Sequence, residues 1–161
     1  MQQGIYLIAP EKTDEKKLID RFNRFRAKQT PDALLFDPTD RPVDAVRLFI
    51  DTVQAGNVAV ILKNNIDLAL KLSADGVQIP YQADIKKIRK QTESISLGVL
   101  CATRDEAMRA GEAGADYIGF DTPDAENLTQ WWSELFTVPC VDFNLDRPSS
   151  IADFQIVVLT D

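Results

Sequence analysis

The chain has 161 residues, which is enough for one domain with a substantial core and too few for two ordinary domains, so we expect a single domain over residues 1–161. Hydrophobic residues make up 45% and charged residues 27%, a balance typical of globular proteins. The net charge of −7 argues against nucleic-acid and membrane partners, because such surfaces need clustered Lys and Arg.

Eight short apolar runs recur along the chain, separated by amphipathic or polar segments. Most of the runs are continuous and rich in Val, Ile and Leu, which is typical of parallel strands covered on both faces. They span residues 5–10, 32–37, 58–64, 76–80, 95–100, 117–121, 139–144 and 154–160. Eight strands are therefore predicted.

Helical patterns lie between these runs. The segment 14–29 carries an apolar stripe at helical spacing, made of Leu18, Ile19, Phe22 and Phe25. The segment 43–56 ends in Gly56, a favourable C-cap, and a short helix is expected between Asn64 and Pro80.

Two later helices carry start signals. The segment TRDEAMRAGEAG begins with a capping box of Thr103 and Glu106 and closes at Gly114. The segment TPDAENLTQWWSELF is expected to have Thr122 as its N-cap and Pro123 at its first helical position.

The alternation of strands and helices, with eight strands, predicts a (β/α)8 TIM barrel, and an open doubly wound sheet is the alternative. We expect an incomplete barrel. Only LDRPSSIAD separates the last two strands, which reduces helix seven to a loop, and helix eight is missing.

The wall beside the first, seventh and eighth strands should then lack cover. Exposed apolar patches of that size usually mark an interface, so we expect a homodimer or another partner over this face. Alternatively, the first helix and Trp131 with Trp132 tilt to fill the gap. The two tryptophans point about 100° apart, so one is expected in the core and one near the surface.

The chain contains no histidine, which excludes Ser-His, Cys-His and His-metal chemistry. Cys101 and Cys140 form no CxxC pair and are expected to be small buried hydrophobes. The opening MQQGIYLIAP has no basic n-region, so we expect no signal peptide and a cytoplasmic location.

Four stretches resemble the thiamine-phosphate synthases, within them the alphaproteobacterial type: IYLIAP, DLALKLSADGVQI, LGVLCATRDEAMRAGEAGADYIGF and WWSELFTVPCV. ADGV and GADYIGF are fairly specific for this family and for the sister thiazole tautomerases. The family is a (β/α)8 barrel, in agreement with the strand count. The tautomerases use a histidine for proton transfer, which this chain lacks.

The resemblance implies an enzyme that joins a pyrimidine diphosphate to a thiazole phosphate and releases pyrophosphate, with magnesium and basic residues holding the diphosphate. Such groups sit at the carboxyl ends of the strands. This chain departs from the pattern there. Leu34, Phe36 and Pro38 stand where the second strand should end in Gln-x-Arg-x-Lys, and Lys63-Asn64 replaces Asn-Asp.

The remaining strand ends also depart. The fourth reads PYQA in place of Gly-Gln-x-Asp, with Asp84 one position late, and the fifth has Leu100-Cys101 in place of a Ser or Thr. FDTPDAEN lacks the phosphate loop expected after the sixth strand, and Phe143-Asn144 replaces Gly-Gly after the seventh.

We therefore expect a thiamine-phosphate-synthase-like protein that has lost catalysis and keeps the scaffold for a binding or regulatory role. It would need no cofactor and no metal. One alternative is an active but divergent synthase, in which Lys63 holds a phosphate and Asp84 with Asp121 holds Mg²⁺. Another is a different small-molecule function at the barrel mouth.

The candidate mouth residues are Asp37, Lys63, Asn64, Tyr81, Cys101, Asp121, Thr122 and Asn144, with Glu11 beside them. Three acids and one Lys favour a cationic or neutral ligand over a phosphate ester. A purely structural interpretation of these residues is favoured, because helix caps and exposed ion pairs are common. In it Lys63 pairs with Asp37 or Asp121, while Asp121 and Thr122 cap the sixth helix.

Overall fold

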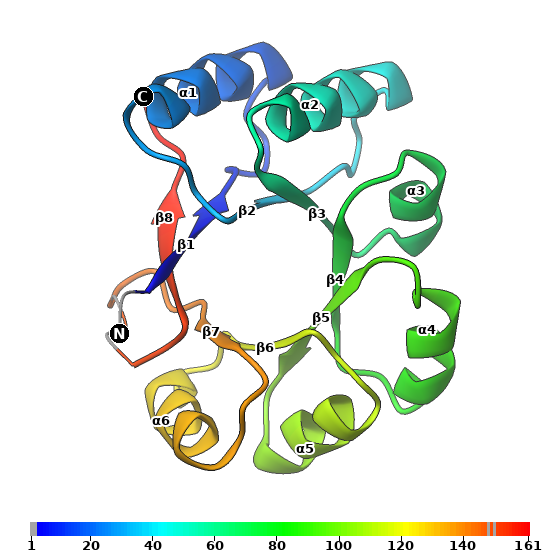
Figure 1. Ribbon diagram of the computed structural model, residues 1–161, viewed down its shortest axis with the longest axis vertical. Coiled ribbons are helices and arrows are strands. Elements are labelled where there is room, and N and C mark those ends of the chain that lie inside the picture. The colour runs from blue at the N-terminus through cyan, green and yellow to red at the C-terminus, as the bar shows by residue number, and fades with distance from the viewer. Residues whose placement is uncertain (1–2, 148, 150) are drawn as a thin grey trace.

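The structure, a computed structural model, describes residues 3–147, 149 and 151–161. Eight parallel strands close in chain order into a barrel, and the last strand pairs with the first (Figure 1). The strands are β1 (Gly4–Ile8), β2 (Ala33–Phe36), β3 (Ala59–Lys63), β4 (Gly76–Pro80), β5 (Ser96–Cys101), β6 (Tyr117–Phe120), β7 (Cys140–Asp142) and β8 (Phe154–Val158). The predicted (β/α)8 barrel is confirmed, and the doubly wound alternative is wrong.

Helices surround the ring of strands (Figure 1). They are α1 (Glu15–Lys28), α2 (Val43–Ala55), α3 (Ile66–Lys71), α4 (Ile85–Gln91), α5 (Arg104–Glu112) and α6 (Ala125–Leu135). In the part of the chain that the structure describes, none of them has the length and apolar character needed to cross a membrane.

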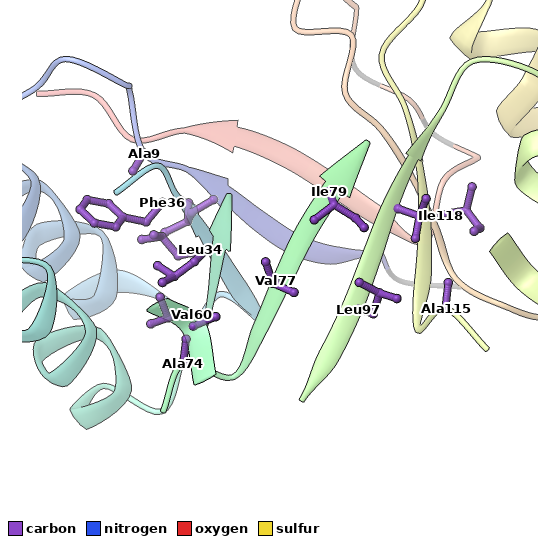
Figure 2. Packing of buried hydrophobic residues seen from close by; sticks show 14 of the residues in the cluster. Ala9, Leu34, Phe36, Val60, Ala74, Val77, Ile79, Leu97, Ala115 and Ile118 are labelled. Atoms are coloured by element: carbon purple, nitrogen blue, oxygen red, sulfur yellow. The ribbon is translucent and has the colours of Figure 1, made fainter. Parts of the chain in front are cut away.

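Alternation along each strand creates two separate cores. Outward-facing residues pack under the helices, as Leu34, Phe36 and Val60 do in Figure 2. Inward-facing residues fill the barrel, among them Tyr6, Leu35, Ile61, Tyr117 and Val141. Because both faces of the strands from β2 to β6 are covered, their runs read as continuous apolar sequence rather than alternating sequence.

An aspartate stands immediately before every even-numbered strand and ties it to the strand before it. Its Oδ2 accepts a hydrogen bond of 2.8 Å from a backbone N–H of the preceding strand. The four pairs are Asp32 with Ile5, Asp75 with Val60, Asp116 with Leu97 and Asp153 with Cys140. Charge-assisted hydrogen bonds of this kind are stronger than neutral ones, so the four aspartates stabilise the pairing of each even-numbered strand with the strand before it.

The predicted helix signals are largely confirmed. Asp14 caps α1, whose Leu18 and Phe22 are buried, and Thr103 caps α5 by accepting from the Glu106 N–H at 3.1 Å. The chain leaves α5 through Gly114, whose φ of +98° suits a residue without a side chain.

The predicted start of the sixth helix is wrong. The helix α6 begins at Ala125, three residues after Thr122. Its N-cap is Asp124, two residues after Thr122. A turn closed by the Ala125 N–H and the Thr122 carbonyl, 3.0 Å apart, precedes it. Pro123 therefore lies in this turn, and neither Asp121 nor Thr122 caps the helix.

Among the described residues no helix lies between β7 and β8 or follows β8, as expected. Figure 1 shows the resulting opening between α6 and α1. On β8 the outward Gln155 is exposed, while Val157 is half-buried and shares a groove with Phe25 of α1.

The helix α1 therefore covers part of the opening. In α6, Trp132 is buried and Trp131 is half-buried. The homodimer over the uncovered remainder stays a prediction.

Candidate functional site

A cavity of about 390 Å³ opens at the carboxyl ends of the strands. Its wall is mostly apolar. The lining residues are Ile8, Ala9, Pro10, Glu11, Leu35, Lys63, Gln78, Leu100, Asp121, Phe143, Leu145 and Val158. This is the end of a (β/α)8 barrel at which active sites occur, so we call it the mouth cavity.

The charges of the mouth cavity are at its rim. Lys63 Nζ lies 2.7 Å from the Glu11 carboxylate, and Asp121 is exposed. The predicted pairing of Lys63 with Asp37 or Asp121 is therefore wrong. Glu11, on the loop after β1, reaches the end of β3 and neutralises the only cation that lines the cavity among the described residues.

A buried polar network lies at the inner end of the mouth cavity. The hydroxyls of Tyr6 and Tyr117 are 2.6 Å apart, and the Tyr117 hydroxyl donates to Gln78 Oε1 at 2.6 Å. Gln78 is only 2% exposed. Burial raises the pKa of both phenols above the ordinary value of 10.0, so they stay protonated at neutral pH.

Two inward-facing glycines make room for the aromatic residues of this interior. A methyl group at Gly98 would overlap the ring of Tyr117, and one at Gly119 would lie 2.6 Å from the ring of Phe143. Tyr6 contacts both Tyr117 and Phe143 edge-on, with ring centroids 5.7 and 5.5 Å apart. The barrel is therefore closed by aromatic rings directly beneath the mouth cavity.

Of the predicted site residues, Lys63 and Asp121 line the mouth cavity, together with Glu11. Asp37 lies in a neighbouring cavity between the loops after β1 and β2. Its Oδ1 accepts from the Thr39 N–H at 2.9 Å, so it stabilises a turn. Arg41, the buried cation of that second cavity, is already bound by Glu15 at 3.1 Å.

Asn64, Tyr81 and Asn144 follow strand ends but do not line the mouth cavity. Asn64 is exposed with a φ of +66°, and its N–H donates to the Gln78 carbonyl at 2.8 Å. The Tyr81 N–H donates to the Leu100 carbonyl, also at 2.8 Å. The Asn144 N–H donates to the buried carboxylate of Asp142 at 2.9 Å.

Cys101 faces outward into the helix-covered core, where it is 1% exposed. Burial, and secondarily the charge of Glu106, raises the pKa of the Cys101 thiol to about 12. Burial also raises the pKa of Cys140. Both cysteines are free and buried, as expected, and the thiol of Cys101 is unsuited to nucleophilic chemistry.

Thr122 is half-buried beside the mouth, and its Oγ1 is fully buried with no hydrogen-bond partner among the described residues. Asp84 is exposed at the start of α4 and lines neither the mouth cavity nor the second cavity. Mg²⁺ requires several oxygen ligands at one point. The pair Asp84 and Asp121 does not supply them, and the described residues contain no group of three His, Cys, Asp or Glu suited to a metal.

Sequence reasoning missed Gln78, Tyr6 and Tyr117. A signal was present, because each is a polar residue within an apolar strand. Each also stands at a position whose side chain points into the barrel, two residues from another inward-facing position. The sequence did not reveal that three different strands bring them together.

The family model described as thiamine monophosphate synthase matches residues 5–122. The chain belongs to this family. A thiamine-phosphate synthase of Erythrobacter litoralis is 41% identical over 103 residues, which cover 54% of this chain and 48% of that protein. One from Rhodospirillum centenum is 35% identical over 133 residues, covering 73% and 60%.

The thiamine phosphate pyrophosphorylase structure from Pyrococcus furiosus aligns with a TM-score of 0.76 at 18% identity, covering 96% of this chain and 85% of that one. This similarity supports the barrel fold. The chain spans about half the length of the curated thiamine-phosphate synthases it matches. The family range ends at residue 122, so α6, β7 and β8 lie beyond it.

Proposed function

We propose that this member of the thiamine-phosphate synthase family binds a small molecule in the mouth cavity and has lost the catalysis of its relatives. The observation that carries the proposal is the Glu11–Lys63 ion pair over an apolar cavity. The binding serves a regulatory or carrier role rather than turnover.

Holding a diphosphate needs cations or several free backbone N–H groups. Lys63 is the one cation on the cavity wall among the described residues, and Glu11 already neutralises it. Asp121 adds negative charge at the same rim. A diphosphate at this place would therefore be repelled rather than held.

The mouth cavity would bind its ligand without Mg²⁺. Asp84 and Asp121 do not come together as oxygen ligands, so the described residues offer no metal site to neutralise the charge that develops on a leaving pyrophosphate. Without that neutralisation the cavity retains shape and apolar surface, which suit binding.

The test is a synthase assay with the pyrimidine diphosphate, the thiazole phosphate and Mg²⁺, in which thiamine phosphate is read as thiochrome fluorescence after phosphatase treatment. We expect no product above a control without protein. A bacterial thiamine-phosphate synthase serves as the positive control, and far-UV circular dichroism verifies that the protein is folded.

Product that forms with the wild type and disappears in Lys63→Ala would overturn the loss of catalysis. It would establish the alternative, a divergent synthase rebuilt around Lys63. Titration with pyrophosphate, followed through the backbone amide signals in NMR spectra, adds an independent arm. We expect no shift of mouth amides with or without Mg²⁺.

A further inference from the structure

The hydrogen bonds beneath the mouth cavity form a chain that ends on the amide oxygen of Gln78. Tyr6, Tyr117 and Gln78 are joined by two contacts of 2.6 Å. Within the described residues, the one other contact of the two hydroxyls is a longer one, 3.4 Å, from Tyr6 to the same Gln78 Oε1. Each phenol hydroxyl has one proton to donate, and the amide oxygen is the acceptor at the end of the chain.

Turning the Gln78 amide over would reverse both bonds. Its N–H would then donate to Tyr117, Tyr117 would donate to Tyr6, and the Tyr6 proton would have no acceptor among the described residues. An unsatisfied buried donor is costly, and neither phenol ionises at neutral pH, because burial raises the pKa of each. The two tyrosines therefore hold Oε1 inward.

The other end of the amide is then free for a ligand. Gln78 lines the mouth cavity, and its Nε2 donates to no partner among the described residues. The surfaces around it are apolar, supplied by Leu35, Leu100 and Phe143 among others. The charged residues described at this cavity lie at its rim, where Glu11 is engaged by Lys63 and Asp121 is exposed.

We propose that Gln78 determines the specificity of the mouth cavity and selects an uncharged ligand that carries a hydrogen-bond acceptor, such as a carbonyl or N-oxide oxygen, at its inner end. The inference rests on the binding function proposed above for the same cavity. Tyr6 and Tyr117 are positioning residues that fix the amide. A cation would meet N–H groups at the inner end, and an anion would lose its hydration for a single neutral donor.

The test uses two probes of nearly equal size, pyridine N-oxide and N-methylpyridinium, titrated separately against ¹⁵N-labelled protein. The N-oxide oxygen accepts a hydrogen bond, whereas the methyl group in its place does not and the molecule is a cation. One neutral hydrogen bond predicts that pyridine N-oxide binds about fivefold more tightly. Shifts should include the side-chain NH₂ signals of Gln78.

Three variants locate the effect. Gln78→Met should abolish the preference for pyridine N-oxide. Gln78→Glu accepts the Tyr117 proton but offers no N–H, and it should reverse the preference in favour of N-methylpyridinium. Gln82→Ala is the matched control, because this glutamine is exposed just beyond the same strand and does not line the cavity. It should leave both affinities unchanged.

The outcomes separate this inference from the function on which it rests. Equal or tighter binding of N-methylpyridinium at the wild-type mouth would overturn the role of Gln78 and leave a binding cavity in place. An unchanged preference in Gln78→Glu would do the same. If neither probe shifts the mouth amides of folded wild-type protein, the inference and the proposed binding function both fail.

Discussion

The hydrogen bond between the Asp153 carboxylate and β7 allows a test of how much these aspartates stabilise the barrel. The carboxylate of Asp153 accepts from the Cys140 N–H at 2.8 Å, and Cys140 is fully buried. The replacement Asp153→Ala removes this acceptor. The backbone bonds of Asp153 to the Cys140 carbonyl and from the Gly4 N–H are retained, so the change isolates the side chain.

Hydrogen bonds to charged groups contribute about 1.5–3 kcal/mol. Asp153 is exposed, so solvent weakens the charge and we take the lower end. We expect Asp153→Ala to lower the free energy of unfolding by about 1.5 kcal/mol. Asp153→Asn keeps an acceptor oxygen without the charge and should lose about half as much, by the difference between charged and neutral bonds.

The assay is equilibrium urea unfolding followed by tryptophan fluorescence and by far-UV circular dichroism. Asp51→Ala is the control, because Asp51 is exposed in the middle of α2 and makes no hydrogen bond or ion pair among the described residues. If Asp153→Ala differs from Asp51→Ala by less than about 0.5 kcal/mol, the range of ordinary surface substitutions, the carboxylate does not pin β7 and β8.

Three further results are expected. In the unfolded chain Cys101 has its ordinary pKa of 9.0, whereas in the folded chain the pKa is about 12. The free energy of unfolding should therefore fall as pH rises through this window. The decline should be shallower in Cys101→Ala. Iodoacetamide at pH 7.5 should label neither Cys101 nor Cys140 until urea is added, because both are buried; rapid native labelling would contradict this. Sedimentation velocity should give about twice the chain mass of 18.0 kDa, and Arg24→Glu, beside the groove over β8, should give monomer; a monomeric wild type refutes the dimer.

The strands and all the helices except α4 were predicted from the sequence because their signals are local. Continuous apolar runs mark strands covered on both faces, and Thr103 and Gly114 mark the two ends of α5 through local backbone geometry and contacts. The start of α6 was misplaced because Thr122 and Asp124 are both plausible caps. The choice between them depended on the turn that leads out of β6.

The candidate site was only partly predictable. Position at a strand end was enough to place Lys63 and Asp121 at the mouth. It was not enough for Asn64 or Cys101, because a residue next to the last inward position points away from the barrel. The partner of Lys63 lies on the loop after β1, 52 residues away in sequence, and charge alone did not distinguish Glu11 from Asp37.

The sequence by itself determined the number of strands, their parallel packing and the family, since these rest on apolar periodicity and on motifs such as ADGV and GADYIGF. The tertiary structure alone decided which polar groups meet. Tyr6, Gln78 and Tyr117 come from three strands, and their hydrogen bonds exist only because closure of the barrel brings those strands around one interior. Local signals act over a few residues, whereas this network depends on the curvature of the whole sheet.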